Sequence, residues 1–432
     1  MANFFNNISN RVVSVCRKSI FKDTSWMLLS KMLGAIVQTA YFILVARYLG
    51  AENYGTFEGI KAIWAILFPF IGLGMGDMLV QHVSRDQAKF SRYWGDSLLV
   101  FMMSVGVALI TIFPLVVMLF PSVSPVFILL VLIADVVGLK LCNYAGLAFI
   151  SVHKVKRASQ FSMIYVVSKL ITALFLPLFP EDQRLLAWGF LYCIGSIIPG
   201  VILFALVSRN IGKPAFNLKV FNPSQLKQGF FFSLSESASG INAQIDRTML
   251  VSLASPTAAG IYGAGYRFID MGNIPIFAFL GANYARFFKH GEAGIKGSFG
   301  FARKFLPLAC LYGAASAGAL ILFAPLVPKI LGDEYVQSSL VLIWFAPLHL
   351  ITGLQFLAAD TLTGAGLQRS RSFIQVGAAI LNVSLNFYLI PIYSWQGAIW
   401  ATLSSECFKL VTLWVVVFFT YQKAVKLDHS RR

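Results

Sequence analysis

Long apolar windows follow one another along almost the whole chain of 432 residues. The first runs from about Trp26 to Arg47, and roughly 20 apolar residues in a helix can cross a bilayer core about 30 Å thick. Hydrophobic residues make up 57% of the chain and charged residues 12%, so no soluble domain fits between the windows. The other windows cover approximately residues 55–80, 95–119, 125–150, 158–179, 185–208, 227–253, 259–283, 301–325, 337–362, 370–391 and 396–421. The sequence predicts an all-α polytopic membrane protein with twelve transmembrane helices, because backbone groups in lipid must be hydrogen-bonded within each helix.

The distribution of Lys and Arg tests this helix count independently. Basic residues collect on the cytoplasmic side of membrane proteins. With the N-terminus inside, the predicted inside segments hold 25 of the 35 basic residues and the predicted spans hold seven. The outside loops hold only Arg47, Arg184 and Lys329. An odd number of helices would remove this asymmetry, so we predict that both termini are cytoplasmic.

Charge and cysteine usage exclude several classes of function. The net charge of +17 fits contact with anionic membrane lipids, so no nucleic acid partner is expected. The five cysteines lie far apart, without a CxxC pattern or a Cys/His grouping, so neither a disulfide framework nor a metal site is predicted. The chain also lacks a GxxxxGK[ST] phosphate-binding motif, and no cofactor is expected.

The two halves of the chain carry related elements. The segment 49–55, between the first two spans, matches 258–263 at a shift of 208 residues. The basic segment 154–157 matches 368–371 at a shift of 214. The sequence therefore predicts two pseudo-symmetric six-helix lobes, residues 1–212 and 213–432. Each lobe has an even number of helices, so the repeats run parallel, as in transporters that open a central cavity to either side.

These elements resemble a known family. The element from Ala46 to Gly55, and Asp246-Arg247 followed by Ala259 to Gly263, are similar to the polysaccharide exporters of the multidrug/oligosaccharidyl-lipid/polysaccharide (MOP) superfamily, in particular bacterial O-antigen flippases. The resemblance extends over the whole chain in length, helix count and repeat. It implies a multi-pass flippase of the bacterial inner membrane that moves an undecaprenyl-diphosphate-linked oligosaccharide by alternating access. A polysaccharide polymerase is a further expected partner.

Several charges lie inside the predicted spans. A basic residue that faces lipid costs at least a few kcal/mol, so each one must face water, a partner or a cavity. The seven basic residues are Lys31, Lys61, Lys140, Lys169, Arg247, Arg267 and Lys409. Residues three or four apart share one face of a helix. This spacing predicts three pairs, namely Glu58 with Lys61, Arg267 with Asp270, and Glu406 with Lys409.

Four of these cations are predicted to bind the substrate. Arg267 lies about eight residues from the outer end of its span, or about 12 Å at 1.5 Å per residue, near mid-membrane. Lys31 lies in the cytoplasmic half of span one, while Lys61 and Arg247 lie in the outer halves of spans two and seven. Arg and Lys in a semi-dry cavity can replace the water around a diphosphate with charge-assisted hydrogen bonds. The resemblance implies cavity-lining cations on spans one, two, seven and eight, with Lys31 and Arg267 as its candidates.

Energy for transport must come from another source than a bound nucleotide. An ion gradient of protons or sodium is the expected driver, and acids inside the spans are the candidate coupling residues. These acids are Asp135, Glu236 and Asp270. Glu236 has no basic residue within a turn of helix, whereas Asp270 is expected to hold Arg267 in place.

Three other functions compete with the flippase. A multidrug antiporter of the same superfamily exports cations and should line its cavity with acids, whereas bases are at least as prominent here. A membrane polysaccharide polymerase or ligase needs a sizeable external loop with catalytic groups, yet every predicted outside loop is short. A pure scaffold would keep costly intramembrane charges without a use.

Overall fold

The structure is a computed structural model of the chain, and it describes residues 2–429 except 85, 153, 217–232 and 234–243. The described residues are almost entirely helical and contain no β-strand. They form two compact units: Met1–Leu49 with Ile63–Ile241, and Gly50–Ala62 with Asn242–Arg432. The division into lobes at residue 212 stays a prediction. The structure places the short segment 50–62 in the second unit.

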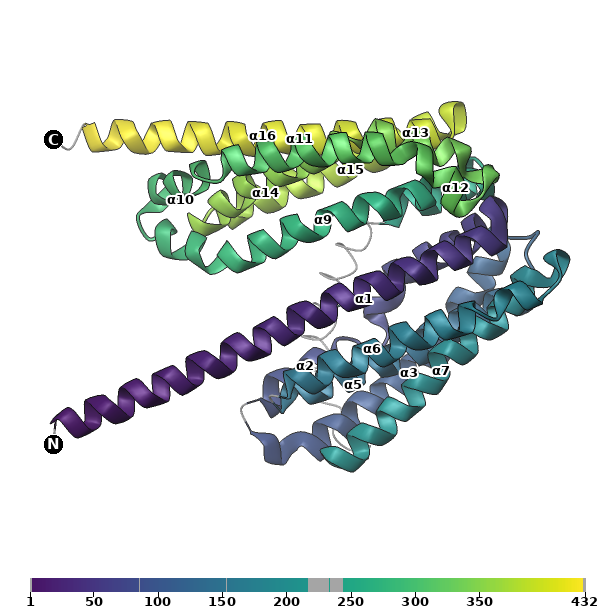
Figure 1. Cartoon of the computed structure of the whole chain (residues 1–432), viewed down its shortest axis with the longest axis horizontal. Helices are drawn as coiled ribbons and strands as arrows, with labels where there is room; N and C mark the ends of the chain where they lie inside the picture. The colour runs from purple at the N-terminus through teal and green to yellow at the C-terminus, as the bar shows by residue number, and fades with distance from the viewer. Residues whose placement is uncertain (1, 85, 153, 217–232, 234–243, 430–432) are drawn as a thin grey trace. The chain divides into compact units, whose positions relative to one another are not determined.

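The helices of the two units are drawn in Figure 1. The helices up to residue 210 are α1 (Ala2–Leu67), α2 (Met75–Val83), α3 (Phe90–Leu119), α4 (Pro125–Ile133), α5 (Lys140–Ser151), α6 (Val155–Ala173) and α7 (Arg184–Asn210). The later ones are α9 (Pro256–Gly291), α10 (Gly294–Arg303), α11 (Leu306–Phe323), α12 (Val327–Leu331), α13 (Val336–Phe345), α14 (Leu348–Gly364), α15 (Gln368–Tyr393) and α16 (Trp395–His429). In the first unit α7 packs against α4, α5 and α6, and in the second unit α14 packs against α9, α11 and α16.

Short helical turns join the longer helices. The 3-10 turns are η1 (Phe68–Phe70), η2 (Gln87–Lys89), η4 (Leu176–Leu178), η5 (Glu181–Gln183), η6 (Ala324–Leu326) and η7 (Asp333–Tyr335). A π-helical turn, η3 (Ala134–Leu139), connects α4 to α5. A further helical segment, 244–253, precedes α9.

Helix α1 contains a kink that separates its two parts. Gly50 adopts φ 75° and ψ 170°, which an L-residue with a side chain would adopt only under strain. Immediately after the kink, the backbone N–H of Ala51 donates to Oε2 of Glu334 at 2.8 Å. The carboxylate therefore caps the start of segment 51–67, where unpaired N–H groups favour an anion.

The predicted span 55–80 is broken near its middle. Gly72 and Gly74 have φ values of 78° and 65°, so the chain leaves the helix between η1 and α2. The freed backbone groups find partners on other helices of the first unit. Lys140 donates to the carbonyl of Phe68 at 3.1 Å, and Tyr144 donates to that of Gly72 at 3.3 Å. Non-helical backbone at membrane depth is tolerated where protein satisfies it in this way.

Segment 50–62 and the start of α9 touch backbone to backbone. A Cβ on Gly55 would lie 1.7 Å from the carbonyl oxygen of Pro256, and one on Gly260 would lie 2.0 Å from that of Ala51. Only glycine allows this approach. Ser255 begins α9, and its hydroxyl accepts from the N–H of Ala258 at 3.1 Å. The glycines of the sequence repeat thus bring the two charge-bearing helices together.

Among the described residues, eight helices are long and apolar enough to cross a membrane. A ninth span arises if Asp333–Phe345 and Leu348–Gly364, which are bent by 42°, count as one. The predicted span 227–253 lies largely outside the described residues, and the predicted span 259–283 lies within the uninterrupted helix α9. The count of twelve and the cytoplasmic termini therefore stay predictions.

Candidate functional site

Glu58 is the centre of a charged cluster in the second unit. Its carboxylate receives Nη2 of Arg267 at 2.9 and 3.1 Å, through both oxygens. Nζ of Lys61 lies 3.0 Å from Oε1, and Nη1 of Arg247 lies 3.7 Å from Oε2. We call Glu58, Lys61, Arg247, Arg267 and Asp270 the Glu58 cluster. Three of the four predicted substrate-binding cations meet there.

Arg247 extends the cluster beyond Glu58. Its Nη2 lies 3.6 Å from Oδ2 of Asp270 on α9, and its Nη1 donates to Gln244 at 3.1 Å. The guanidinium carbon lies 5.3 Å from the centre of the Tyr266 ring, within the range of cation–π attraction. The Glu58 cluster therefore contains three cations and two carboxylates, with one net positive charge.

Burial makes these charges energetically important. The side chains of Arg247 and Glu58 are only 5% and 6% exposed, whereas that of Asp270 is 48% exposed. Taking charges out of water is costly, and removing one partner of a buried pair leaves an uncompensated charge. The Glu58 cluster is thus buried at Glu58 and half-exposed at Asp270.

The other predicted site residues are Lys31, Glu236 and Asp135. The backbone of Lys31 belongs to α1, but its side chain lies outside the described part of the structure, and Glu236 lies outside the described residues altogether. Asp135 belongs to the first unit, within the π-helical turn η3. Its side chain is buried and accepts from the Tyr192 hydroxyl at 2.7 Å. Turns of this type occur frequently at functional sites.

Two of the three predicted pairs within a helix are confirmed. Lys61 pairs with Glu58 at 3.0 Å, and Lys409 pairs with Glu406 at 2.6 Å. The predicted pair of Arg267 with Asp270 is wrong. Arg267 reaches across to Glu58 on another helix, and Asp270 pairs with Arg247 instead. A carboxylate on a neighbouring helix can offer both oxygens, which a partner one turn along the same helix does not.

A second polar site surrounds Asp246. Its Oδ2 accepts from the hydroxyls of Tyr262 at 2.8 Å and Thr402 at 2.7 Å, and its Oδ1 accepts from the Asn386 amide at 2.6 Å. These partners come from α9, α16 and α15, and all are uncharged. The carbonyl oxygen of Asn386 is buried without a hydrogen-bond partner. One carboxylate among two neutral hydroxyls and a neutral amide suits a proton or a hard monovalent cation. Among the described residues, no group of three or more His, Cys, Asp or Glu could hold a metal ion.

Sequence reasoning missed the roles of Glu58 and Asp246. Glu58 was assigned only to Lys61, because spacing along one helix reveals no partner on another. Asp246 was part of the family resemblance without a role of its own. One signal was available: Asn382 and Asn386 lie four residues apart, and Thr402 and Ser405 three apart, so each pair places polar groups on one face of an apolar span.

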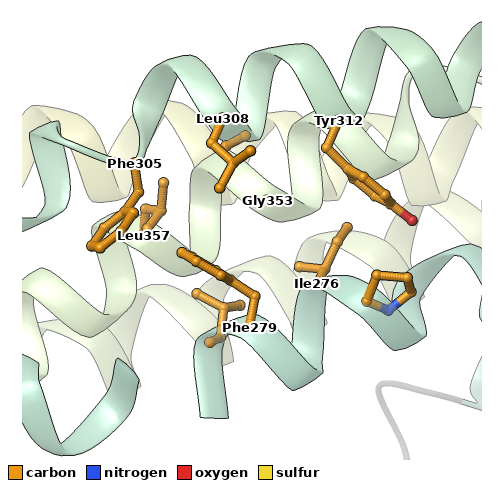
Figure 2. Close-up of a pocket in the computed structure, with 10 residues that line it drawn as sticks. Ile276, Phe279, Phe305, Leu308, Tyr312, Gly353 and Leu357 are labelled. Carbon is orange, nitrogen blue, oxygen red and sulfur yellow. The ribbon is translucent and has the colours of Figure 1, made fainter. Parts of the chain in front are cut away.

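An apolar cavity lies elsewhere in the second unit, and Figure 2 shows the residues around it. It measures about 210 Å³ and is lined by side chains of α9, α11 and α14. One hydroxyl, that of Tyr312, lies at its edge and donates to the carbonyl of Gly272 at 2.6 Å. The residues that line it include no charged side chain, so it does not suit an anionic head group.

Comparison with known families decides the classification. Residues 20–289, more than half of the chain, match the family described as polysaccharide biosynthesis protein. The chain belongs to this family. No curated protein sequence matches it.

Solved structures establish the fold of this family member as that of MOP superfamily transporters. An inward-facing multidrug resistance MATE family transporter is similar over 92% of this chain and 96% of its own, with 13% identity and a TM-score of 0.73. The lipid II flippase MurJ, in an inward closed conformation, is similar over 90% and 87%, with 15% identity and a TM-score of 0.70. A MOP superfamily transporter from Pyrococcus furiosus is similar over 94% and 96%, with 16% identity and a TM-score of 0.62.

Proposed function

We propose that this protein is a flippase that moves an undecaprenyl-diphosphate-linked oligosaccharide from the cytoplasmic to the outer leaflet of the bacterial inner membrane. The Glu58 cluster carries the proposal. Three cations converge from segment 50–62, segment 244–253 and α9, at positions where a charge that faced lipid would be costly. Such a site can bind the anionic head group of a lipid-linked substrate among otherwise apolar spans.

The chemistry of a diphosphate matches these side chains. A diphosphate carries about two negative charges and many acceptor oxygens, and it cannot enter hydrocarbon without compensation. Arginine binds phosphate through a planar fork of donors, while lysine supplies a compact charge. The Glu58 cluster offers two arginines and one lysine. In this proposal Lys31 supplies a further cation near the cytoplasmic side.

An ion gradient drives the cycle in this proposal, with Asp246 as its main coupling residue. Asp246 has neutral hydrogen-bond donors on three helices and directly precedes Arg247 in the chain. Uptake of a proton or a sodium ion at Asp246 therefore changes the field at an arginine that binds cargo. Asp270, which is half-exposed beside the Glu58 cluster, and Asp135 in the first unit remain secondary candidates.

The charge of the Glu58 cluster argues against export of cationic drugs. A cation would meet three basic groups and two carboxylates that are already paired with them. An anion is attracted instead, because the Glu58 cluster has one positive charge in excess. The MATE transporter and MurJ share the fold with this chain, and the fold alone does not choose between their cargoes.

Deletion of the gene tests the proposal. We expect loss of the surface polysaccharide, together with accumulation of its lipid-linked precursor on the cytoplasmic side. Arg267→Ala and Lys31→Ala should fail to restore the polysaccharide, whereas Lys409→Ala should largely restore it, because Lys409 pairs with Glu406 apart from the Glu58 cluster. If the deletion leaves the polysaccharide intact and instead sensitises the cells to cationic drugs, the multidrug antiporter is the better assignment.

A further inference from the structure

The carboxylate of Glu58 lies where three basic side chains converge. Lys61, Arg247 and Arg267 all direct a nitrogen to it, at 3.0, 3.7 and 2.9 Å. We propose that Glu58 is an exchangeable internal anion. When no cargo is bound, its carboxylate pairs with the three cations. The diphosphate displaces the carboxylate when it binds, and the carboxylate displaces the diphosphate when the cargo is released. This inference rests on the proposed function.

The donors of Arg267 are only partly used by Glu58. A single nitrogen of the guanidinium, Nη2, contacts both carboxylate oxygens. A guanidinium forms its strongest complexes when two N–H groups bind two oxygens in parallel. A diphosphate has enough acceptor oxygens to satisfy both edges of Arg267. The Glu58 carboxylate is therefore a replaceable partner of this arginine.

The charges balance only if Glu58 leaves the arginines. A diphosphate brings about two negative charges. Together with Glu58 and Asp270 it would place about four negative charges against three cations. If Glu58 withdraws together with Lys61, the diphosphate matches the charge of the two arginines, and Asp270 is half-exposed to water. Because excess charge in a buried site is costly, binding of the diphosphate should expel Glu58 from the arginines.

Lys61 gives the displaced carboxylate a partner. It lies one helical turn after Glu58 on the same segment, and its side chain is 23% exposed. Residues at this spacing stay in contact when the helix moves as a unit. Glu58 can thus turn away from Arg247 and Arg267 without losing every cation. The two arginines lie on other helices and can remain with the cargo.

This role predicts that a neutral substitution at Glu58 strengthens binding of the diphosphate and slows its release. In Glu58→Gln the cations no longer have an internal competitor, so the diphosphate should bind more tightly. For the same reason nothing replaces the departing cargo, and release should become slower. A purely structural role predicts a different result, since loss of the cluster geometry would weaken binding and slow transport together.

The experiment uses the full chain in lipid nanodiscs and in proteoliposomes, with a short-chain polyprenyl diphosphate disaccharide as the probe. For Glu58→Gln we expect a Kd lower by at least about tenfold and a release rate lower by a similar factor. Glu58→Asp keeps the charge but shortens the side chain, so both values should fall between those of Glu58→Gln and the wild type. Glu406→Gln is the matched control, because Glu406 also pairs with a lysine three residues later, and it should change neither value.

The possible outcomes separate this inference from the proposed function. If the wild type binds the probe and Glu58→Gln binds it equally well or more weakly, the internal-anion role is wrong and the flippase stands. If Glu58→Gln does not fold, the test falls to Glu58→Asp. A Kd and a release rate of Glu58→Asp that both equal those of the wild type would overturn the internal-anion role. If the wild type itself does not bind the probe, the proposed cargo is wrong and the inference is lost with it.

Discussion

Asp246 and Arg247 are consecutive residues that face different partners. Asp246 accepts hydrogen bonds from Tyr262, Thr402 and Asn386, whereas Arg247 lies against Glu58 and Asp270. A pair of tyrosines on α9 joins the two sites a second time. Tyr262 donates to Asp246 and stacks on Tyr266 at 5.6 Å, and the guanidinium of Arg247 lies over the Tyr266 ring. Uptake of an ion at Asp246 can therefore affect Arg247 through the backbone and through the stacked rings.

This arrangement predicts the effect of Asp246→Asn. The substitution removes the charge and keeps the shape, so it should abolish the ability of an ion gradient to drive flipping. Coupling between two sites typically changes affinity by about 5- to 150-fold. We expect the rate of flipping under an imposed gradient to decrease by a factor in this range. Proteoliposomes with an imposed proton or sodium gradient provide the measurement.

Binding of cargo without a gradient is the control for Asp246→Asn. Arg247 keeps its contacts with Glu58 and Asp270, so Asp246→Asn should still bind a polyprenyl diphosphate, with an affinity that no longer changes with pH or sodium concentration. Thr402→Ser keeps the hydroxyl that donates to Asp246 and should retain coupling. Gradient-driven flipping by Asp246→Asn at the wild-type rate would exclude Asp246 as the coupling residue.

Arg267→Lys should not replace arginine in function. A lysine ammonium keeps the charge but lacks the planar fork that can bind two oxygens of a phosphate in parallel. Arg267→Ala should weaken binding of the diphosphate lipid by about 2–5 kcal/mol, the range for truncating one partner of a buried charge pair. Titration of the purified variants with the lipid measures this loss. If Arg267→Lys binds and transports as the wild type does, charge alone suffices and the fork is irrelevant.

The sequence predicted the local part of this architecture well. Membrane-length apolar windows indicated an all-helical membrane protein, and spacing along one helix identified the pairs of Lys61 with Glu58 and Lys409 with Glu406. Both inferences depend on helix periodicity, which a single sequence contains.

The remaining features depend on contacts between distant residues. Arg267 and Glu58 are separated by 209 positions, so the spacing rule assigned Arg267 to the nearer Asp270 instead. The break at Gly72 and Gly74 looked like part of an unbroken span, because hydrophobicity does not report positive φ values. Asp246 had no candidate partner, since its neighbours come from three other helices.

Glu334→Ala should destabilise the second unit. The Glu334 carboxylate caps Ala51 directly after the kink of α1, and loss of a cap of this kind costs about 0.5–2 kcal/mol. Asp333→Ala removes a neighbouring carboxylate that does not cap this helix, and it should leave the melting temperature unchanged. Thermal unfolding in detergent measures both. Equal effects of the two substitutions would show that the local negative charge matters more than the cap.

Gly55→Ala should separate segment 50–62 from α9 and so disturb the Glu58 cluster. The added Cβ would lie 1.7 Å from the carbonyl oxygen of Pro256, and overpacking typically costs about 1–3 kcal/mol. We expect a lower melting temperature together with weaker binding of the diphosphate lipid, because Glu58 and Lys61 lie on the displaced segment. Gly263→Ala is the matched control on α9, since no atom lies within 4 Å of its added Cβ, and alanine should stabilise that helix by about 0.5–1 kcal/mol. If both variants melt and bind as the wild type does, the close glycine contact does not position the Glu58 cluster.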